Sequence, residues 1–383
     1  MQEKLKNTDF MVAATKSQGL LVWGTRDRWF ESSQPEICLK ILRTLCVAVA
    51  SASSCALAGC GAAGMALHAS PSTTAVAAST GRLASGIWSS FAVNGYLQGI
   101  VRAKNGDFWV ADGDQTSTLS RITPNGNVTV YNIGYVPLEE AMDGAGNLWL
   151  TVKPNLQEIV RVSPRLKLTL YTLHDDTAGG IMIGGDGNVW FAETSHVGRL
   201  TPDGVLTEFA VGRVEGESGI AWANGSVWFR GQWTGGAGLE SVDPSNGNVV
   251  AYEAPVYDGG AIVSAKGSLW CASGSSGGAL PLVQFNLKSK AVTTYDAPTA
   301  YDPYGAPGDM TLDSDGSLWY TSQRLQSGRV VGGGLVRFDI ATKQFTTYAS
   351  PPSYGWQWDV AAAPDGRLWA TSAFAVVALK PKE

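Results

Sequence analysis

Two histidines and three acidic residues lie close together in the chain, at His174, Asp175, Asp176, Glu193 and His196. Imidazole exchanges a proton near neutral pH, and imidazole combined with carboxylates also forms divalent metal sites. If the loops that carry these residues meet, the group suits acid–base catalysis, with Glu193, His196 and His174 as candidate catalytic residues. The alternative is that all five are solvated loop residues.

A second group combines aromatic and acidic side chains in the segments that enter successive apolar runs. The acidic members are Glu139, Glu140, Asp309 and Asp359. The aromatic members are Tyr96, Tyr135, Tyr257, Tyr301, Tyr304, Tyr354, Trp356 and Trp358. Flat rings beside polar groups suit a sugar, a peptide or an aromatic small molecule, unless the tyrosines simply pack beneath the loops. The candidate ligand-binding residues are Tyr96, Gln98, Glu139, Tyr304, Trp356 and Trp358.

The composition restricts the class of protein. The 383 residues are 44% hydrophobic and only 16% charged, and they include 14 Trp, which excludes a disordered chain. The 46 Gly favour turns and sheets over long helices. The net charge of −5 argues against a nucleic-acid partner, and we expect a monomer.

Seven copies of one phrase are the strongest pattern in the sequence, and they predict the elements that hold these groups. Each copy is a turn, a Gly, an apolar residue and a Trp, as in Asp186-Gly187-Asn188-Val189-Trp190. The repeated tryptophans are Trp109, Trp149, Trp190, Trp228, Trp270, Trp319 and Trp369. Their spacing of about 40 to 50 residues is typical of four-stranded propeller blades.

The two ends of the repeat array complement each other. The last copy ends after three strand patterns, whereas residues 88–92 before the first copy resemble the fourth strands of the other copies. A strand donated in this way closes the ring and removes exposed sheet edges. We therefore predict an all-β fold, a seven-bladed β-propeller over residues 84–383, closed by an N-terminal strand that completes the last blade. In that fold the loops bearing His174 and His196 emerge on one face.

The segment before the propeller resembles the export signal of a bacterial lipoprotein. Lys40 and Arg43 precede an apolar run that ends in Leu57-Ala58-Gly59-Cys60, similar to a lipobox. The resemblance implies residues 39–60 as a signal, lipidation of Cys60, and an exported protein anchored to the membrane at the periplasm or cell surface. A buried apolar helix is the alternative.

The flanking segments follow from that prediction. Residues 1–38 are expected to be a non-native upstream extension, because an export signal lies near the true start of a protein. Residues 61–83 are rich in Ala, Ser and Thr and are expected to be a flexible tether.

The repeat itself resembles that of the virginiamycin B lyase (streptogramin lyase) family. The resemblance is carried by residues 180–193 followed by Val197-Gly198-Arg199-Leu200-Thr201-Pro202-Asp203-Gly204, and it extends over all seven copies. It implies a seven-bladed propeller and an enzyme that opens a cyclic depsipeptide antibiotic by elimination at its ester. Such enzymes use a histidine base and Mg²⁺ held by glutamates.

The residues at the family's functional positions differ in this chain. The position of the catalytic histidine is occupied by Gln98, Leu138, Gly179, Ser218, Gly259, Gly308 and Trp358. None of these is a histidine. The acidic position three residues after each Trp keeps a carboxylate only at Asp112 and Glu193, which are the candidate ligands for a possible Mg²⁺.

Three hypotheses remain open. The first is a lipid-anchored propeller that binds a small molecule, glycan or peptide on its top face without the lyase histidine. The second is an enzyme, either a divergent metal-dependent lyase or a lactone hydrolase, that uses Glu193 with His196 or His174. The third is a scaffold with a closed top face.

Overall fold

The computed structural model describes most of the chain from residue 80 onward and a few short segments before it. The described residues are 13–16, 19–24, 28–31, 67–69, 74–77, 80–93, 95–113, 117–153, 157–214, 219–233, 236–256, 260–272, 281–296, 309–326, 329–372 and 375–382. Cys60, the segment 39–60 and Tyr304 lie outside them, so the predictions for these residues stay predictions.

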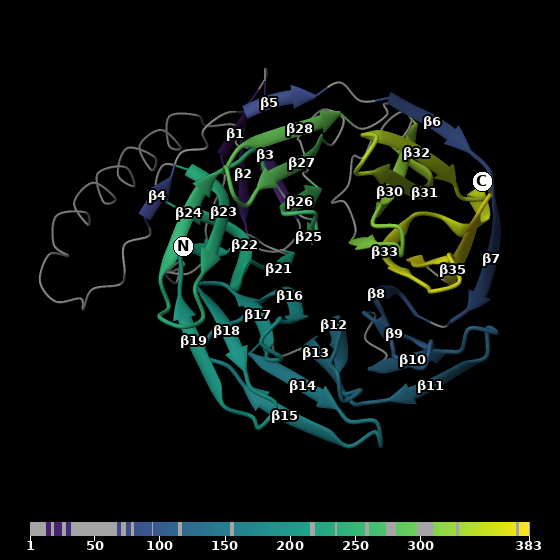
Figure 1. Cartoon of the computed structure of the whole chain (residues 1–383), viewed down its shortest axis with the longest axis horizontal. Helices are drawn as coiled ribbons and strands as arrows, with labels where there is room; N and C mark the ends of the chain where they lie inside the picture. The colour runs from purple at the N-terminus through teal and green to yellow at the C-terminus, as the bar shows by residue number, and fades with distance from the viewer. Residues whose placement is uncertain are drawn as a thin grey trace, which may run out of the picture. The chain divides into compact units, whose positions relative to one another are not determined.

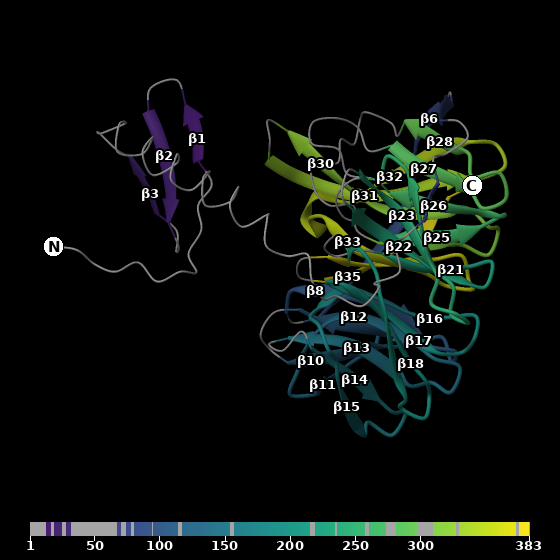
Figure 2. The ribbon, with the colours of Figure 1, turned by 90° about the vertical axis from the view of Figure 1, so that its left-hand side faces the viewer.

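The chain divides into two compact units, residues 1–63 and 64–383. In the first unit, β1 (Ala13–Lys16), β2 (Gly19–Gly24) and β3 (Arg28–Glu31) form one antiparallel sheet in that order (Figure 2). The prediction that residues 1–38 are a non-native extension is not tested by this sheet.

The second unit is a β-propeller whose seven sheets surround a common centre (Figure 1). Blade one consists of β8 (Leu97–Arg102), β9 (Phe108–Asp112), β10 (Thr118–Ile122) and β11 (Val128–Asn132). Blade two consists of β12 (Val136–Met142), β13 (Leu148–Lys153), β14 (Glu158–Val162) and β15 (Leu168–Thr172). Blade three consists of β16 (Thr177–Ile183), β17 (Val189–Glu193), β18 (His196–Leu200) and β19 (Leu206–Ala210).

The remaining four blades complete the ring. Blade four consists of β20 (Arg213–Val214), β21 (Ile220–Ala223), β22 (Ser226–Trp233), β23 (Gly236–Val242) and β24 (Val249–Glu253). Blade five consists of β25 (Ile262–Ala265), β26 (Ser268–Ala272), β27 (Pro281–Asn286) and β28 (Val292–Asp296). Blade six consists of β29 (Met310–Leu312), β30 (Leu318–Gln326), β31 (Arg329–Asp339) and β32 (Gln344–Ala349). Blade seven consists of β33 (Gln357–Ala362), β34 (Leu368–Ser372), β35 (Ala375–Pro381) and β7 (Gly86–Ala92). The 3₁₀ turn η1 (Pro352–Tyr354) precedes β33.

Closure by an N-terminal strand is confirmed. Strand β7 pairs antiparallel with β35, from Ala92 opposite Ala375 to Gly86 opposite Pro381. Trp369 of blade seven is fully buried and stacks on Phe91 of β7 and Phe108 of blade one, with ring centroids 4.7 Å apart in both pairs. Aromatic packing therefore joins the last blade to the first.

The repeated tryptophans fill the space between blades, as their regular spacing predicted. Six of the seven are at most 3% exposed, and the exception, Trp109, is partly exposed. The turn before the Trp strand also holds the indole, since Trp149 Nε1 donates to Asp143 (3.0 Å) and Trp319 Nε1 donates to Asp313 (2.7 Å). The recurrent acidic turn residue therefore satisfies a buried donor.

Three short strands lie within or at the edge of the stretch predicted to be a tether. These strands are β4 (Leu67–Ala69), β5 (Thr74–Ala77) and β6 (Thr80–Ala84), and they pair parallel with the outer strands β24, β28 and β32. The stretch has no alternating apolar pattern, but such pairing uses the unpaired backbone groups of an edge strand and needs none. Figure 1 shows β4, β5 and β6 outside blades four to six.

No helix among the described residues is long and apolar enough to cross a membrane.

Substituting Trp369 tests the junction between the last and first blades. Because the ring is fully buried between two other aromatic rings, Trp369→Ala should lower the free energy of unfolding by about 3–5 kcal/mol. Chemical denaturation measures this loss. The matched control is Trp109→Ala, which is at the same position of the first repeat but is partly exposed. An equal loss of stability in both variants would contradict the special role of Trp369 at the junction.

Candidate functional site

The start of several inner strands is built around a β-bulge that turns acidic residues toward the centre of the ring. The register shifts between Pro137 and Glu140 in β12 and between Gln357 and Val360 in β33. A threonine of the next strand holds each bulge, because its hydroxyl accepts the N–H of a bulge residue: Thr151 that of Glu139 and Thr371 that of Asp359, at 3.1 Å each. Bulges of this kind redirect side chains.

Four carboxyl groups meet at this centre, which we call the ring centre: Glu139 and Glu140 of β12, Asp309 before β29, and Asp359 of β33. They come from blades two, six and seven. Asp359 is bound by two backbone N–H groups, of Ile100 in blade one (2.6 Å) and of Val360 (2.5 Å). The backbone of two neighbouring blades therefore fixes its carboxyl group.

The electrostatics of the ring centre favour protonation. Burial, and then the charges of Asp309, Glu139 and Glu140, hold the pKa of Asp359 well above its usual range. Burial, followed by the charges of Glu139 and Asp309, does the same to the pKa of Glu140. Burial also raises the pKa of Asp309, whose carboxyl group hydrogen-bonds to that of Asp359. The group therefore does not carry four full charges at neutral pH.

Glu140 occupies a position that is apolar in the other blades. It pairs with the residue after the repeated Trp, as do Ile100, Ile181 and Val360 in their own blades. Both of its carboxylate oxygens are buried. Gly99 of blade one leaves the necessary space, since a Cβ there would lie 2.1 Å from Glu140 Oε2.

Aromatic side chains lie beside the acidic ones. Trp358 directly precedes Asp359, and its ring lies 5.7 Å from that of Tyr96 and 5.9 Å from that of Trp356. The Nε1 donors of Trp356 and Trp358 make no hydrogen bond to the residues that the structure describes. Three of the candidate ligand-binding residues therefore form one aromatic cluster.

The other candidate ligand-binding residues lie at blades one and two. Gln98 is half-buried in the bulge of β8, its side chain packs against Gly113, and its carbonyl accepts a hydrogen bond from Thr371 (2.7 Å). Glu139 lies at the ring centre. Tyr304 lies outside the described residues.

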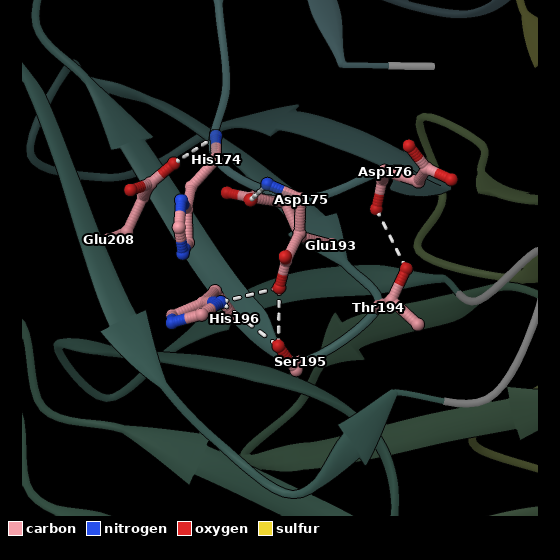
Figure 3. Close-up of polar contacts among 8 residues, drawn as sticks. All are labelled: His174, Asp175, Asp176, Glu193, Thr194, Ser195, His196 and Glu208. Carbon is pink, nitrogen blue, oxygen red and sulfur yellow. Dashed lines mark hydrogen bonds and ion pairs between the residues drawn. The ribbon is translucent and has the colours of Figure 1, made fainter.

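The histidines and acids of blade three also come together, at what we call the blade-three group: His174, Asp175, Glu193 and His196 (Figure 3). His174 and Asp175 lie in the turn before β16, Glu193 ends β17, and His196 begins β18. His196 Nδ1 lies 2.7 Å from Asp175 Oδ2, and the two imidazole rings are 5.5 Å apart. The carbonyl of Asp176 accepts a hydrogen bond from Thr194 Oγ1 (3.0 Å).

Ser195 joins this group without forming a catalytic triad. Its hydroxyl contacts Asp175 Oδ2 and lies 3.1 Å from His196 Nδ1, the same nitrogen that contacts Asp175. In a nucleophilic triad the hydroxyl and the carboxylate use opposite imidazole nitrogens. The arrangement instead orients His196 through Nδ1, and the pKa of Asp175 is lowered by its hydrogen bonds to Ser195 and His196.

Glu193 is fully buried and is the least solvated member of the blade-three group. Its Oε2 accepts the N–H of Asp175 (3.2 Å), while Oε1 has no hydrogen-bond partner among the described residues. Burial, and then the charges of Glu208 and Asp175, raise the pKa of Glu193 to about 8. The side chain is therefore mostly a neutral acid at pH 7.

The two carboxylates proposed to hold Mg²⁺ do not form one group. Asp112 ends β9 in blade one and accepts a hydrogen bond from Thr118 Oγ1 (2.5 Å). Among the described residues, the donor atoms close enough together to hold a metal ion belong to Asp175, Glu193 and His196, with one donor atom of each lying within 4.8 Å of the others. Mg²⁺ prefers six oxygen ligands, so two carboxylates and an imidazole fit it poorly.

A buried glutamate in blade four escaped the sequence analysis. Glu240 of β23 is fully buried opposite Phe229, where blade three has Gly198 opposite Phe191. Gly231 stands at the position that corresponds to Glu193. Blades three and four thus each place a buried glutamate next to a glycine. The glutamate is on the Trp strand in blade three and on the following strand in blade four. Comparing both strands of the two repeats reveals this exchange.

A cavity of about 400 Å³ lies beside the turns that follow β29 and β33 in blades six and seven. These turns are at the other end of the inner strands from the acidic residues of the ring centre. Arginines and aspartates line it, including Arg82, Arg337, Arg367, Asp313 and Asp365. None of the candidate site residues does, so this cavity belongs to neither group described above.

Comparison with known proteins identifies relatives of the fold. A sequence model of the virginiamycin B lyase family matches residues 72–278. A solved streptogramin B lyase is 18% identical, with a TM-score of 0.64 over 78% of this chain and 98% of the other. A catalytically inactive histidine-to-alanine variant of virginiamycin B lyase from Staphylococcus aureus, solved with quinupristin, is 19% identical (TM-score 0.63; 78% and 100%).

More distant propellers share the fold. YCF48 bound to D1 peptide is 8% identical, with a TM-score of 0.55 over 78% of this chain and 95% of the other. No curated protein matches the sequence significantly. At these identities the solved structures establish the fold alone.

Glu240 makes the stability of the propeller depend on pH. Burial raises the pKa of its carboxyl group from 4.5 to about 7. The unfolded chain therefore loses this proton at lower pH than the folded chain, and stability falls as pH rises from 4.5 to 7. Because Glu240→Gln removes the titration, unfolding at pH 4 and pH 8 should show the variant gaining about 3 kcal/mol relative to the wild type. A pH-independent difference would contradict this.

Proposed function

The chain belongs to the virginiamycin B lyase family, and from that premise we propose that it is an exported, lipid-anchored propeller that binds a small molecule, glycan or peptide. The proposed binding site is the ring centre with the adjoining aromatic cluster. The observation that carries this proposal is the position of Trp358 and Tyr96 next to four converging carboxyl groups.

The chemistry of this site favours a particular kind of ligand. Exposed faces of Tyr and Trp bind flat apolar groups, and nearby carboxylates bind cations and hydrogen-bond donors. A ligand with an aromatic ring and an ammonium group uses both the aromatic faces and the carboxylates.

Binding without the family's elimination chemistry is supported by the residues at the histidine position. Trp358 holds that position in blade seven and takes part in the aromatic cluster, while Gln98 holds it in blade one and lies in the bulge of β8. Neither side chain serves as a base at neutral pH. The family scaffold is thus proposed to be kept and its chemistry lost.

Export and anchoring rest on the lipobox-like sequence that ends in Cys60. A diacyl-modified cysteine anchors a protein stably, because two acyl chains bury many methylene groups in the bilayer. We expect the expressed protein to incorporate radiolabelled palmitate and to sediment with membranes. In the Cys60→Ser variant both properties should disappear. Membrane association that persists in this variant would contradict the anchor.

The second candidate function is a divergent lyase or lactone hydrolase at the blade-three group, favoured by the contact between Asp175 and His196. Asp175 holds Nδ1, so Nε2 is the nitrogen that acts as base. In an elimination the base takes a proton beside the carbon that bears the ester oxygen, a C=C bond forms, and the ester C–O bond breaks to release a carboxylate. Protonated Glu193 is suited to donate a hydrogen bond to that carboxylate.

Calorimetric titration of the full-length chain tests the binding proposal. The ligands are phenethylamine, a peptide containing Lys and Trp, a neutral oligosaccharide and quinupristin, the ligand of the inactive lyase. We expect saturable binding of at least one. Because the Trp358 ring supplies the contact face, Trp358→Ala should weaken it at least tenfold. Trp222→Ala, a half-buried Trp beside the turn at the other end of an inner strand, is the matched control.

The same samples separate binding from catalysis. Chromatography with mass spectrometry detects opening of quinupristin, as an isomer after elimination or with one added water after hydrolysis. Intact ligand that binds supports the binding function, whereas opening lost in His196→Ala supports the enzyme. The absence of binding to every ligand, or equal weakening by Trp222→Ala, would contradict the binding proposal.

A further inference from the structure

We propose that Asp175, Glu193 and His196 form a metal site within blade three that selects Zn²⁺ over Mg²⁺, with His174 as a fourth ligand. This inference concerns a position away from the ring centre and does not depend on what binds there. All of its ligands come from a single blade and the turn that enters it (Figure 3).

The donor atoms already lie near the spacing that a tetrahedral ion requires. One donor atom of each of the three residues lies within 4.8 Å of the other two, and His196 Nδ1 is 2.7 Å from Asp175 Oδ2. Bond lengths of 2.0–2.2 Å around tetrahedral Zn²⁺ place neighbouring donors ~3.3 Å apart. Binding therefore requires the side chains to draw together from within 4.8 Å to that spacing.

The burial of Glu193 is independent evidence that this group binds a metal ion. Its side chain is fully buried, yet Oε1 has no hydrogen-bond partner among the described residues. A buried polar atom without a partner is costly, and a metal ion removes that cost. The space beside Oε1 depends on Gly198 of β18, where a Cβ would lie 2.7 Å from the oxygen.

His174 is positioned to complete the coordination. Its ring lies 5.5 Å from that of His196, nearly perpendicular to it at 74°. Glu208 of β19 accepts the backbone N–H of His174 at 2.8 Å, which anchors the turn while leaving the imidazole to move. The side chain is exposed, so a change of rotamer meets little resistance.

Contacts around the ligands resemble the outer shell of a metal site. The Ser195 hydroxyl donates a hydrogen bond to the Asp175 carboxylate, and the Asp175 N–H donates one to Glu193 Oε2 (3.2 Å). Hydrogen bonds of this kind orient ligands and raise metal affinity.

The donor set selects the metal. Two imidazoles and two carboxylates match the nitrogen and oxygen ligands of Zn²⁺, whereas Mg²⁺ prefers an octahedron of oxygens and retains its waters. The site therefore differs in ligand type from the Mg²⁺ site that the family resemblance implied.

Titration of the metal-free, full-length chain with Zn²⁺ and separately with Mg²⁺ tests the proposal. Calorimetry should show one Zn²⁺ bound per chain and at least 100-fold weaker Mg²⁺ binding. Substituted Co²⁺ should give the visible absorption of a tetrahedral site without a thiolate charge-transfer band. That band matters because the chain has five cysteines, which also bind Zn²⁺.

Variants connect the signal to the named ligands. Glu193→Gln and His196→Ala should each weaken Zn²⁺ binding at least tenfold. Glu240→Gln is the matched control, because it also alters one fully buried glutamate, in the neighbouring blade, and it should leave the affinity unchanged. Thermal unfolding of each metal-free variant checks that the propeller is folded.

Two results would overturn the site. One is the absence of stoichiometric Zn²⁺ binding by the folded wild-type chain. The other is Zn²⁺ binding that is unaffected by Glu193→Gln and His196→Ala, or accompanied by a thiolate band, since the metal would then lie on other residues.

Discussion

Closure of the ring is the constraint on which the rest of the structure depends. A four-stranded blade buries its faces only against its two neighbours, so an open array would expose one apolar face at each end. The pairing of β7 with β35 and the packing of Trp369 between Phe91 and Phe108 remove both ends at once. The inner strands are thereby held at fixed positions around one centre, where acidic groups from three blades are forced close together.

That rigidity explains how the propeller tolerates several buried carboxyl groups. Asp359 is bound by backbone N–H groups, and Glu193 and Glu240 each lie in space left by a glycine on an adjacent strand. Desolvation raises the pKa of Glu193 and Glu240 toward neutrality, so these acids are largely kept as neutral groups at a cost in stability. Groups of this kind are typical of functional sites.

The repeat pattern predicted the fold because each copy of the Trp phrase marks one blade, so the copies give the number and order of the blades. The same topology predicted that His174, Asp175, Glu193 and His196 meet, since their loops emerge on one face. The pairing of β4, β5 and β6 with the outer strands could not be predicted from the sequence. Pairing through the backbone at a sheet edge requires no alternation of apolar and polar residues, so a stretch rich in Ala, Ser and Thr shows no strand pattern. The burial of Glu140 and Glu240 was also missed, because it depends on glycines that are distant in sequence or on another strand.

The ring centre and its aromatic cluster are proposed to form a ligand site. A crystal structure of the full-length chain soaked with phenethylamine tests this claim most directly, because it locates an aromatic ring and an ammonium group together. We expect the ring of the ligand to stack on Trp358 beside Tyr96, with its ammonium group directed at Glu139. Density confined to other surfaces, or none at a concentration that saturates weak amine sites, would contradict the claim.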